Sequence, residues 1–319
     1  MIIYNKKFDL NLKSYGISVP IHDDRASKTF AALGNIVETP IEEISLLSKS
    51  DLLLAHSREF VDKLFDDRII EEIYKCYELV DSEGNFNRYD PSSASKDLKE
   101  LFETILLHAS ATSRACELAT KKGFCFSLAG GMHHAMSSLG RGFCLINDIV
   151  IAARIFQNNN PSSKVSIIDI DAHKGCGSAQ ITEHDTSIET LSIHMQDGWP
   201  LDPQSGQGDW HIPSTIDIPI GLGEENLYLS KLKEGLDRLS HCELAIVVAG
   251  ADPYEEDILE SASGLKLSKE QMLERDLMVY NFLKERKIAQ VWVMAGGYGP
   301  KTWEIYAQFL KSIREEESF

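Results

Sequence analysis

Two carboxylates and an imidazole alternate along one short stretch of the sequence, at Asp169, Asp171 and His173. They end an apolar run, Val165–Ile170, that predicts a buried strand. Because side chains alternate along a strand, positions 169, 171 and 173 are expected to point the same way. Three such groups together form either a costly charge cluster or a metal site. The plainer alternative, Asp171 as the N-cap of a following helix, explains only one of the three.

A further carboxylate, Asp252, follows the apolar run Leu244–Ala249. Taken alone, its Asp-Pro sequence favours a turn. Ligands of parallel α/β sheets bind at the carboxyl ends of the strands, so Asp252 can reach the same edge as Asp171 and His173. One nitrogen and two oxygen ligands with an open coordination position are typical of a catalytic zinc site. These ligands also suit Fe(II) or Co(II).

Two other apolar runs lead into residues that could do chemistry. Adjacent histidines, His133 and His134, follow Gly130-Gly131, and Tyr298 stands between glycines after Val291–Ala295. Histidine has the side-chain pKa nearest neutrality, so a pair at one water could transfer protons. The alternatives are a solvated histidine pair and a tyrosine in an ordinary glycine-rich turn.

The elements that must position these residues alternate between strands and helices. Four strands are expected, at Val165–Ile170, Glu189–His194, Leu244–Ala249 and Ala289–Ala295. Helices are expected at Phe143–Gln157, Glu224–Leu239, Ser268–Glu285 and Lys301–Arg314, with a capping box at Ser268 and Gln271. This alternation predicts an α/β fold, with a mainly parallel central sheet covered by helices on both faces.

The first half of the chain is less regular. Asp51–Leu64 and Lys96–Lys121 are expected to be helical, and Val80–Ser95 is a polar loop of unusual length. Asp81, Glu83 and Asp90 in that loop could hold a substrate, although solvated loop residues explain them at least as well. No linker, repeat or change of composition divides the chain, so one domain spanning residues 1–319 is expected.

Composition excludes several classes of partner. The chain has 319 residues and a formal charge of −17, which repels nucleic acid and anionic membranes. The sequence has neither the apolar region of a signal peptide nor a run long enough to span a membrane. Its six cysteines form no CxxC pair, which favours free thiols in a reducing compartment. A cytoplasmic protein is expected.

Taken together, the motifs resemble the histone deacetylase superfamily, whose fold is of the arginase–deacetylase type. The order and spacing match over nearly the whole chain, and the compact length is most similar to the class IV branch and its bacterial relatives. The resemblance is carried by five motifs: Gly130-Gly131-Met132-His133-His134-Ala135, Gly142-Phe143-Cys144, Asp169-Ile170-Asp171-Ala172-His173-Lys174-Gly175, Gly250-Ala251-Asp252 and Gly296-Gly297-Tyr298.

The resemblance implies a zinc-dependent amidohydrolase that releases a carboxylic acid from an acylated amine. It makes Asp171, His173 and Asp252 the zinc ligands. It also implies a potassium ion behind the zinc, near Asp169, Asp171, His173 and Ser192.

The same resemblance distributes the catalytic roles. His134 is implied as general base and acid, with His133 as its electrostatic partner and Asp169 as the carboxylate that fixes the His133 tautomer. Tyr298 is implied as the donor that stabilises the oxyanion.

Further residues are implied around these groups. The acyl-lysine tunnel would be lined by Gly142 and Phe143, with Trp199 or Leu201 opposite, and Arg25 would line the channel through which the acid product leaves.

One position departs from the family pattern. Where the family usually has Asp or Asn behind the second histidine, this chain has Cys176, a weaker hydrogen-bond partner. We therefore expect a changed pH optimum.

The substrate is left open by the sequence. Acetyl-lysine or fatty acyl-lysine in peptides is expected, with an acetylated polyamine as the alternative, and an acidic surface would steer cationic substrates of either kind. A manganese hydrolase of the arginase type is disfavoured by His133, His134 and Tyr298. A non-catalytic protein that binds acyl-lysine is kept open by Cys176.

Overall fold

The computed structural model describes residues 1–199 and 211–319. Within them, seven strands form one sheet in the order β1-β2-β7-β6-β3-β4-β5, and every strand pairing is parallel. The strands are β1 Ile2–Ile3, β2 Phe124–Ser127, β3 Val165–Asp169, β4 Ile188–Met195, β5 Ile216–Ile220, β6 Leu244–Ala249 and β7 Ala289–Met294. The predicted parallel α/β sheet is confirmed.

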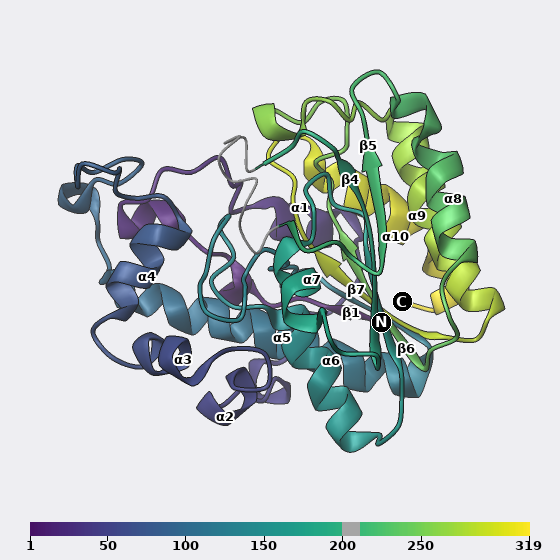
Figure 1. Cartoon of the computed structure of the whole chain (residues 1–319), viewed down its shortest axis with the longest axis horizontal. Helices are drawn as coiled ribbons and strands as arrows, with labels where there is room; N and C mark the ends of the chain where they lie inside the picture. Colours follow the sequence, from purple (N-terminus) through teal and green to yellow (C-terminus); the bar gives the residue numbers. More distant parts are fainter. Residues whose placement is uncertain (200–210) are drawn as a thin grey trace.

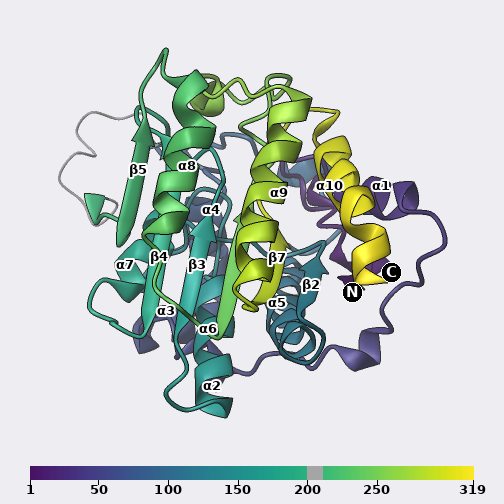
Figure 2. The same cartoon turned by 90° about the vertical axis from the view of Figure 1, so that its right-hand side faces the viewer.

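Helices cover both faces of this sheet. Figure 1 shows α8 and α9 on one side and α5 and α6 on the other, and Figure 2 shows α8 and α9 in front of the strands. The helices are α1 Arg25–Ala32, α2 Lys49–Leu52, α3 Arg58–Leu64, α4 Ile69–Cys76, α5 Leu101–Lys122, α6 Asp148–Asn159, α7 Cys176–Thr182, α8 Tyr228–Asp237, α9 Lys269–Glu285 and α10 Thr302–Glu317. Among them, none combines the length and apolar character needed to cross a membrane.

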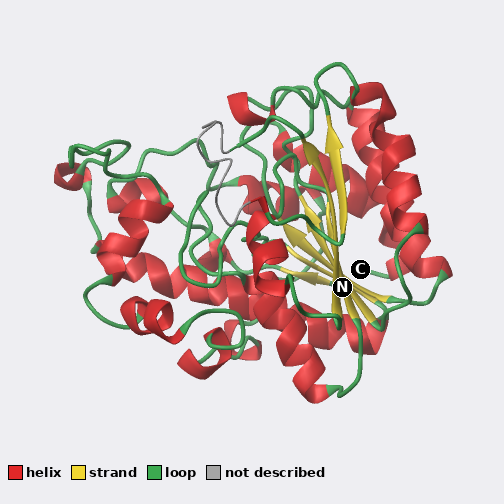
Figure 3. Ribbon diagram, in the orientation of Figure 1, coloured by secondary structure: helices red, strands yellow, loops and turns green. Residues whose placement is uncertain are grey.

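The core lies between the sheet and these helices, with the strands fanning through the middle of the molecule (Figure 3). All residues of β3 and of β6 are buried, which is expected of strands covered on both faces. Helix α9 begins at the predicted capping box, where Ser268 Oγ accepts from Gln271 N. The sequence therefore locates the central strands and α9 closely.

Two helix predictions are wrong at their boundaries. The helix expected from Phe143 begins only at Asp148, because Gly142 and Phe143 have φ values of 55° and 65° and form a turn closed by hydrogen bonds between Arg141 and Cys144. The helix expected over residues 51–64 is two helices, α2 and α3, separated by a turn that ends at the N-cap Ser57.

Candidate active site

The residues that could do chemistry follow four neighbouring strands. Strands β2, β7, β6 and β3 are adjacent in the sheet, and their carboxyl ends lead to the histidine pair, Tyr298, Asp252 and the 169–173 segment respectively. Parallel strands bring these ends to one edge, so four segments far apart in sequence meet there. The expected alternation of strand side chains extends only as far as Asp169, because β3 ends at that residue.

Beyond β3 the chain turns, and backbone hydrogen bonds to carboxylates shape it. Asp169 Oδ1 accepts from Asp171 N at 3.2 Å, and Asp171 Oδ1 accepts from His173 N at 2.9 Å. Helix α7 begins later, with Gly175 as its N-cap residue, so Asp171 is not a helix cap. These bonds turn Asp171 and His173 toward the ends of β6 and β7.

Asp171, His173 and Asp252 form a buried group whose possible ligand atoms lie within 4.8 Å of one another. His173 Nδ1 lies 3.1 Å from Asp171 Oδ1 and 2.9 Å from Asp252 Oδ2. Two carboxylates and one imidazole facing a common point offer the ligand set of a divalent metal with further positions open.

The chemistry of this group fits a bound cation. Asp252 is fully buried, and apart from the nearby His173 Nδ1 its Oδ2 has no possible donor among the described residues. Burial, followed by the charge of Asp171, raises the pKa of Asp252. A Cβ atom at Gly296 would lie 2.4 Å from Asp171 Oδ2 and from Asp252 Oδ2, so only glycine leaves these oxygens accessible. A cation between the two carboxylates would relieve their repulsion.

Two residues that the sequence analysis missed hold the ligands in place. His173 Nε2 lies 2.9 Å from Ser261 Oγ, which leaves Nδ1 free to face the carboxylates. The buried Arg275 donates from Nη1 to the carbonyls of Ile170 and Gly250, both at 2.9 Å, and so ties the ends of β3 and β6 together. Outer contacts of this kind typically fix the orientation of metal ligands.

The two histidines have different partners. His133 donates from Nδ1 to Asp169 Oδ2 at 2.7 Å, whereas His134 Nδ1 lies 3.4 Å from Cys176 Sγ. Their rings are 4.0 Å apart between centroids. The structure thus brings Cys176 behind His134, as expected.

Electrostatics separate the two rings. Burial disfavours a charged His133, but the charges of Asp169 and Asp171 outweigh it and raise the pKa of His133 to about 9. Burial, reinforced by His133 and His173, holds the pKa of His134 well below its usual range. Burial raises the pKa of Cys176 to about 11, so the thiol supplies no negative charge to His134. The surroundings therefore favour the charged form of His133 and disfavour the charged form of His134.

Tyr298 is anchored through its backbone. Asp257 Oδ2 accepts from Tyr298 N at 2.6 Å and from Gly299 N at 3.1 Å, and its Oδ1 accepts from Leu259 N at 2.9 Å. The Tyr298 ring centroid lies 6.5 Å from that of His173. Asp257 therefore fixes the turn that presents Tyr298 beside His173.

A pocket leads from the surface to these groups. Its wall contains Gly142, Phe143, Trp199 and Tyr298, with Leu259 as an additional member. A Cβ at Gly142 would lie 2.6 Å from His134 Cδ2 and 3.0 Å from a ring carbon of Trp199, so glycine is needed for this close approach. Phe143, Trp199 and Leu259 thus give the pocket an apolar part that could hold an alkyl chain.

Two residues that the sequence analysis did not single out, Glu78 and Arg88, also line the pocket and are joined at 2.7 Å. The predicted Asp81 and Asp90 instead accept hydrogen bonds within their own loop turns. The candidates Asp81, Glu83 and Asp90 are exposed and absent from the described pocket wall, and Leu201 lies outside the described residues.

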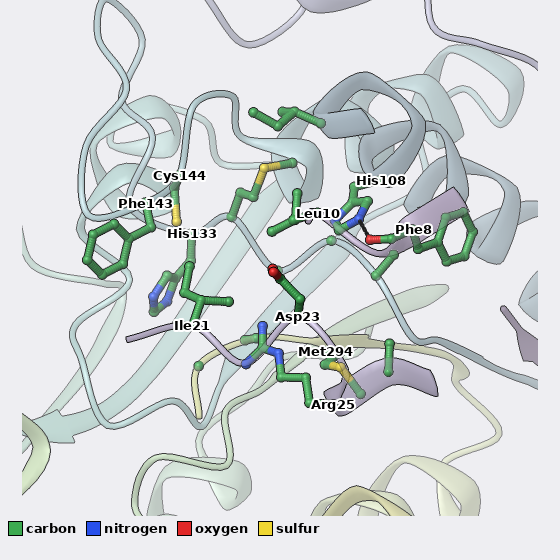
Figure 4. A pocket seen from close by; sticks show the side chains of 18 of the residues that line it. Phe8, Leu10, Ile21, Asp23, Arg25, His108, His133, Phe143, Cys144 and Met294 are labelled. Carbon is green, nitrogen blue, oxygen red and sulfur yellow. Dashed lines mark hydrogen bonds between the residues drawn. The ribbon is translucent and has the colours of Figure 1, made fainter. Parts of the chain in front are cut away.

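Arg25 and Ser192 lie close to the site. Arg25 lines a second cavity behind the histidines (Figure 4), and Ser192 is the register partner of Asp169 across β3 and β4.

Comparisons with known proteins agree with this geometry. A family model described as a histone deacetylase domain matches residues 19–313. The chain is similar to histone deacetylase 2 of Arabidopsis thaliana, at 26% identity over 99% of this chain and 79% of that protein. It is similar to a probable deacetylase of Archaeoglobus fulgidus, at 24% identity over 94% of this chain and 86% of that protein.

The solved structure of a histone deacetylase homologue from Aquifex aeolicus has the same fold. It matches with a TM-score of 0.73 and 21% identity, over 99% of this chain and 83% of that one. The family model covers most of the sequence and includes all five motifs named in the sequence analysis. The chain therefore belongs to the histone deacetylase family.

Proposed function

We propose that the protein is a zinc-dependent deacylase that hydrolyses the amide of an acylated lysine side chain, most readily an acetyl- or fatty acyl-lysine in a peptide. The observation that carries this proposal is the meeting of a metal-ligand triad, a neutral histidine and a tyrosine at the base of one narrow pocket. An acidic chain also favours approach of a cationic peptide.

Asp171, His173 and Asp252 would hold the metal. When bound, a zinc ion lowers the pKa of a coordinated water and polarises the substrate carbonyl, and Fe(II) could serve similarly. Asp169, Asp171, His173 and Ser192 remain our proposal for a structural potassium site.

The protein side chains then divide the proton transfers. Neutral His134 accepts a proton from the attacking water and returns it to the leaving amine. His133, kept cationic by Asp169, places a fixed positive charge beside the developing oxyanion. The Tyr298 hydroxyl donates a hydrogen bond to that oxyanion, a contribution of about 2.7–4 kcal/mol in other enzymes.

The test is turnover of acetyl-, octanoyl- and myristoyl-lysine peptides by protein reconstituted with zinc, with a chelator as control. Acetylated polyamines form a separate arm, since faster turnover there would favour the alternative substrate. A protein that binds these peptides but turns none over would instead be an acyl-lysine-binding protein.

A further inference from the structure

A second cavity lies behind the catalytic residues. His133, His134 and Tyr298 contribute to its wall, together with Asp23, Arg25 and His108. Figure 4 shows His133, Asp23, Arg25 and His108 around it. Its volume, as space available to the centres of water molecules, is about 90 Å³. A single water needs only about 10–15 Å³ by this measure, so the cavity has room for an acyl group of several atoms.

Asp23 is unusual in this wall. Its Oδ2 accepts from Leu12 N at 3.1 Å, but its Oδ1 is buried and has no hydrogen-bond partner among the described residues. Figure 4 shows the Asp23 side chain projecting into the cavity, between His133 and His108. A buried carboxylate oxygen without a donor is costly, and it marks a position where a donor is missing.

The neighbouring groups do not supply that donor. Arg25 Nη1 donates to the Gly297 carbonyl at 3.1 Å, and although the charge of Arg25 acts on Asp23, no hydrogen bond joins the two side chains. His108 Nε2 donates to the Phe8 carbonyl at 2.7 Å, and burial lowers the pKa of His108 to about 4. The ring is therefore neutral, and its Nδ1 is a second acceptor.

A second aspartate lies close to Asp23. Asp9, which is not part of the described cavity wall, has a buried Oδ1 with no hydrogen-bond partner among the described residues, and burial and then the charge of Asp23 raise the pKa of Asp9. Arg25, in the same wall as Asp23, opposes these negative charges and is the residue that a leaving acid product would pass. A carboxylate held directly against Asp23 would still meet a like charge, whereas a hydroxyl or ammonium group would provide the missing hydrogen bond.

We propose that this cavity is a subsite for the acyl group of the substrate, in which Asp23 favours acyl groups that carry a hydroxyl or ammonium donor. Plain aliphatic acyl groups leave Asp23 Oδ1 unpaired, and carboxylate-bearing acyl groups place like charges together. The inference rests on the proposed deacylase function and specifies its substrate class. A site built around a buried polar group discriminates against analogues that lack the matching group, here by about 10-fold or more.

The test compares matched lysine-peptide pairs that differ only in the donor. The pairs are propanoyl and 2-hydroxypropanoyl, butanoyl and 3-hydroxybutanoyl, and hexanoyl and 6-aminohexanoyl, with succinyl as the anionic probe. The ratio of kcat/KM within each pair is measured for the unmodified chain and for the variants Asp23→Asn and Asp23→Leu. Asp24→Asn is the matched control, because Asp24 is exposed and outside the described cavity wall.

We expect at least one donor-bearing acyl group to be preferred about 10-fold or more over its aliphatic partner. Asp23→Leu should abolish that preference, Asp23→Asn should reduce it and improve succinyl turnover, and Asp24→Asn should leave both unchanged. Circular dichroism verifies the fold, and Asp23→Asn, which preserves shape, is decisive if Asp23→Leu is unfolded.

If acetyl-lysine is turned over but the kcat/KM ratio is near one in every pair, the subsite proposal is overturned, because water alone would then satisfy Asp23. The proposed deacylase function would stand in that case. Failure of acetyl-lysine and all other acyl-lysines would overturn the proposed function, and this inference with it.

Discussion

Asp257 binds the backbone at Tyr298 and is absent from the described pocket walls, so replacing it tests whether the position of Tyr298 matters. In Asp257→Asn, the side chain keeps one carbonyl oxygen and gains an amide that cannot accept. Three backbone N–H groups, from Tyr298, Gly299 and Leu259, now share the two carboxylate oxygens. In the variant at least one of them faces another donor, so the turn that carries Tyr298 must shift.

The size of the effect has a lower and an upper bound. A hydrogen bond to a charged group contributes about 1.5–3 kcal/mol, so losing one of the three bonds to Asp257 is sufficient to displace the turn that carries Tyr298. The effect on turnover cannot exceed the contribution of the Tyr298 hydroxyl, about 2.7–4 kcal/mol. Because about 1.4 kcal/mol is a factor of ten, we expect kcat to fall about 10- to 100-fold.

The assay measures kcat and KM on an acetyl-lysine peptide, and zinc affinity by competition with a chelator. We expect zinc affinity to be unchanged. The neighbouring Glu256→Gln serves as control, since Glu256 is exposed and pairs with Lys301 at 2.8 Å. In a Tyr298→Phe background, adding Asp257→Asn should lower kcat only slightly further. If the two losses simply multiply, Asp257 does not act through Tyr298 and the reasoning is refuted.

Three further predictions follow from the surroundings of the site. Cys176→Asp would place a carboxylate behind His134 and raise its pKa, so the acidic limb of the kcat/KM profile should move up by about 1 pH unit or more; an unmoved limb would show that the position is uncoupled. Ser261→Ala should weaken zinc binding about 10- to 100-fold by freeing the His173 ring, with Ser261→Thr restoring it, and equal affinities in a chelator titration would contradict this. Burial lowers the pKa of His56 to about 4, so as the pH falls below about 6.5 the unfolded state binds a proton that the native state excludes. This difference lowers the free energy of unfolding by about 2–3 kcal/mol at pH 4.5. In urea unfolding, the free energy of unfolding of His56→Gln should therefore fall less between pH 7 and 4.5 than that of the unmodified chain.

The central sheet and the meeting of Asp171, His173 and Asp252 could be predicted because local pattern determines them. An apolar run such as Leu244–Ala249 indicates a strand, and the polar residue just beyond it, Asp252, must then lie at the carboxyl edge. Three strands, β1, β2 and β5, were not among the four expected. β1 has two residues and β2 has four, and β5 contains Asp217 and Pro219 at the sheet margin.

The supporting contacts could not be predicted from pattern. Ser261 and Asp257 lie in an irregular segment after β6, where no periodicity indicates which side chains turn toward His173 or Tyr298. Arg275 resembles any charged residue of an amphipathic helix until its buried contacts with β3 and β6 are seen. These roles depend on tertiary packing between segments that are distant in sequence.

The most direct test of the proposed activity is turnover of an acetyl-lysine peptide by the zinc-reconstituted protein, compared with Tyr298→Phe. The proposal predicts chelator-sensitive release of acetate, and a loss of about 100- to 1,000-fold in kcat for Tyr298→Phe with zinc affinity retained. Equal turnover by the two proteins, or turnover that survives removal of the metal, would contradict it.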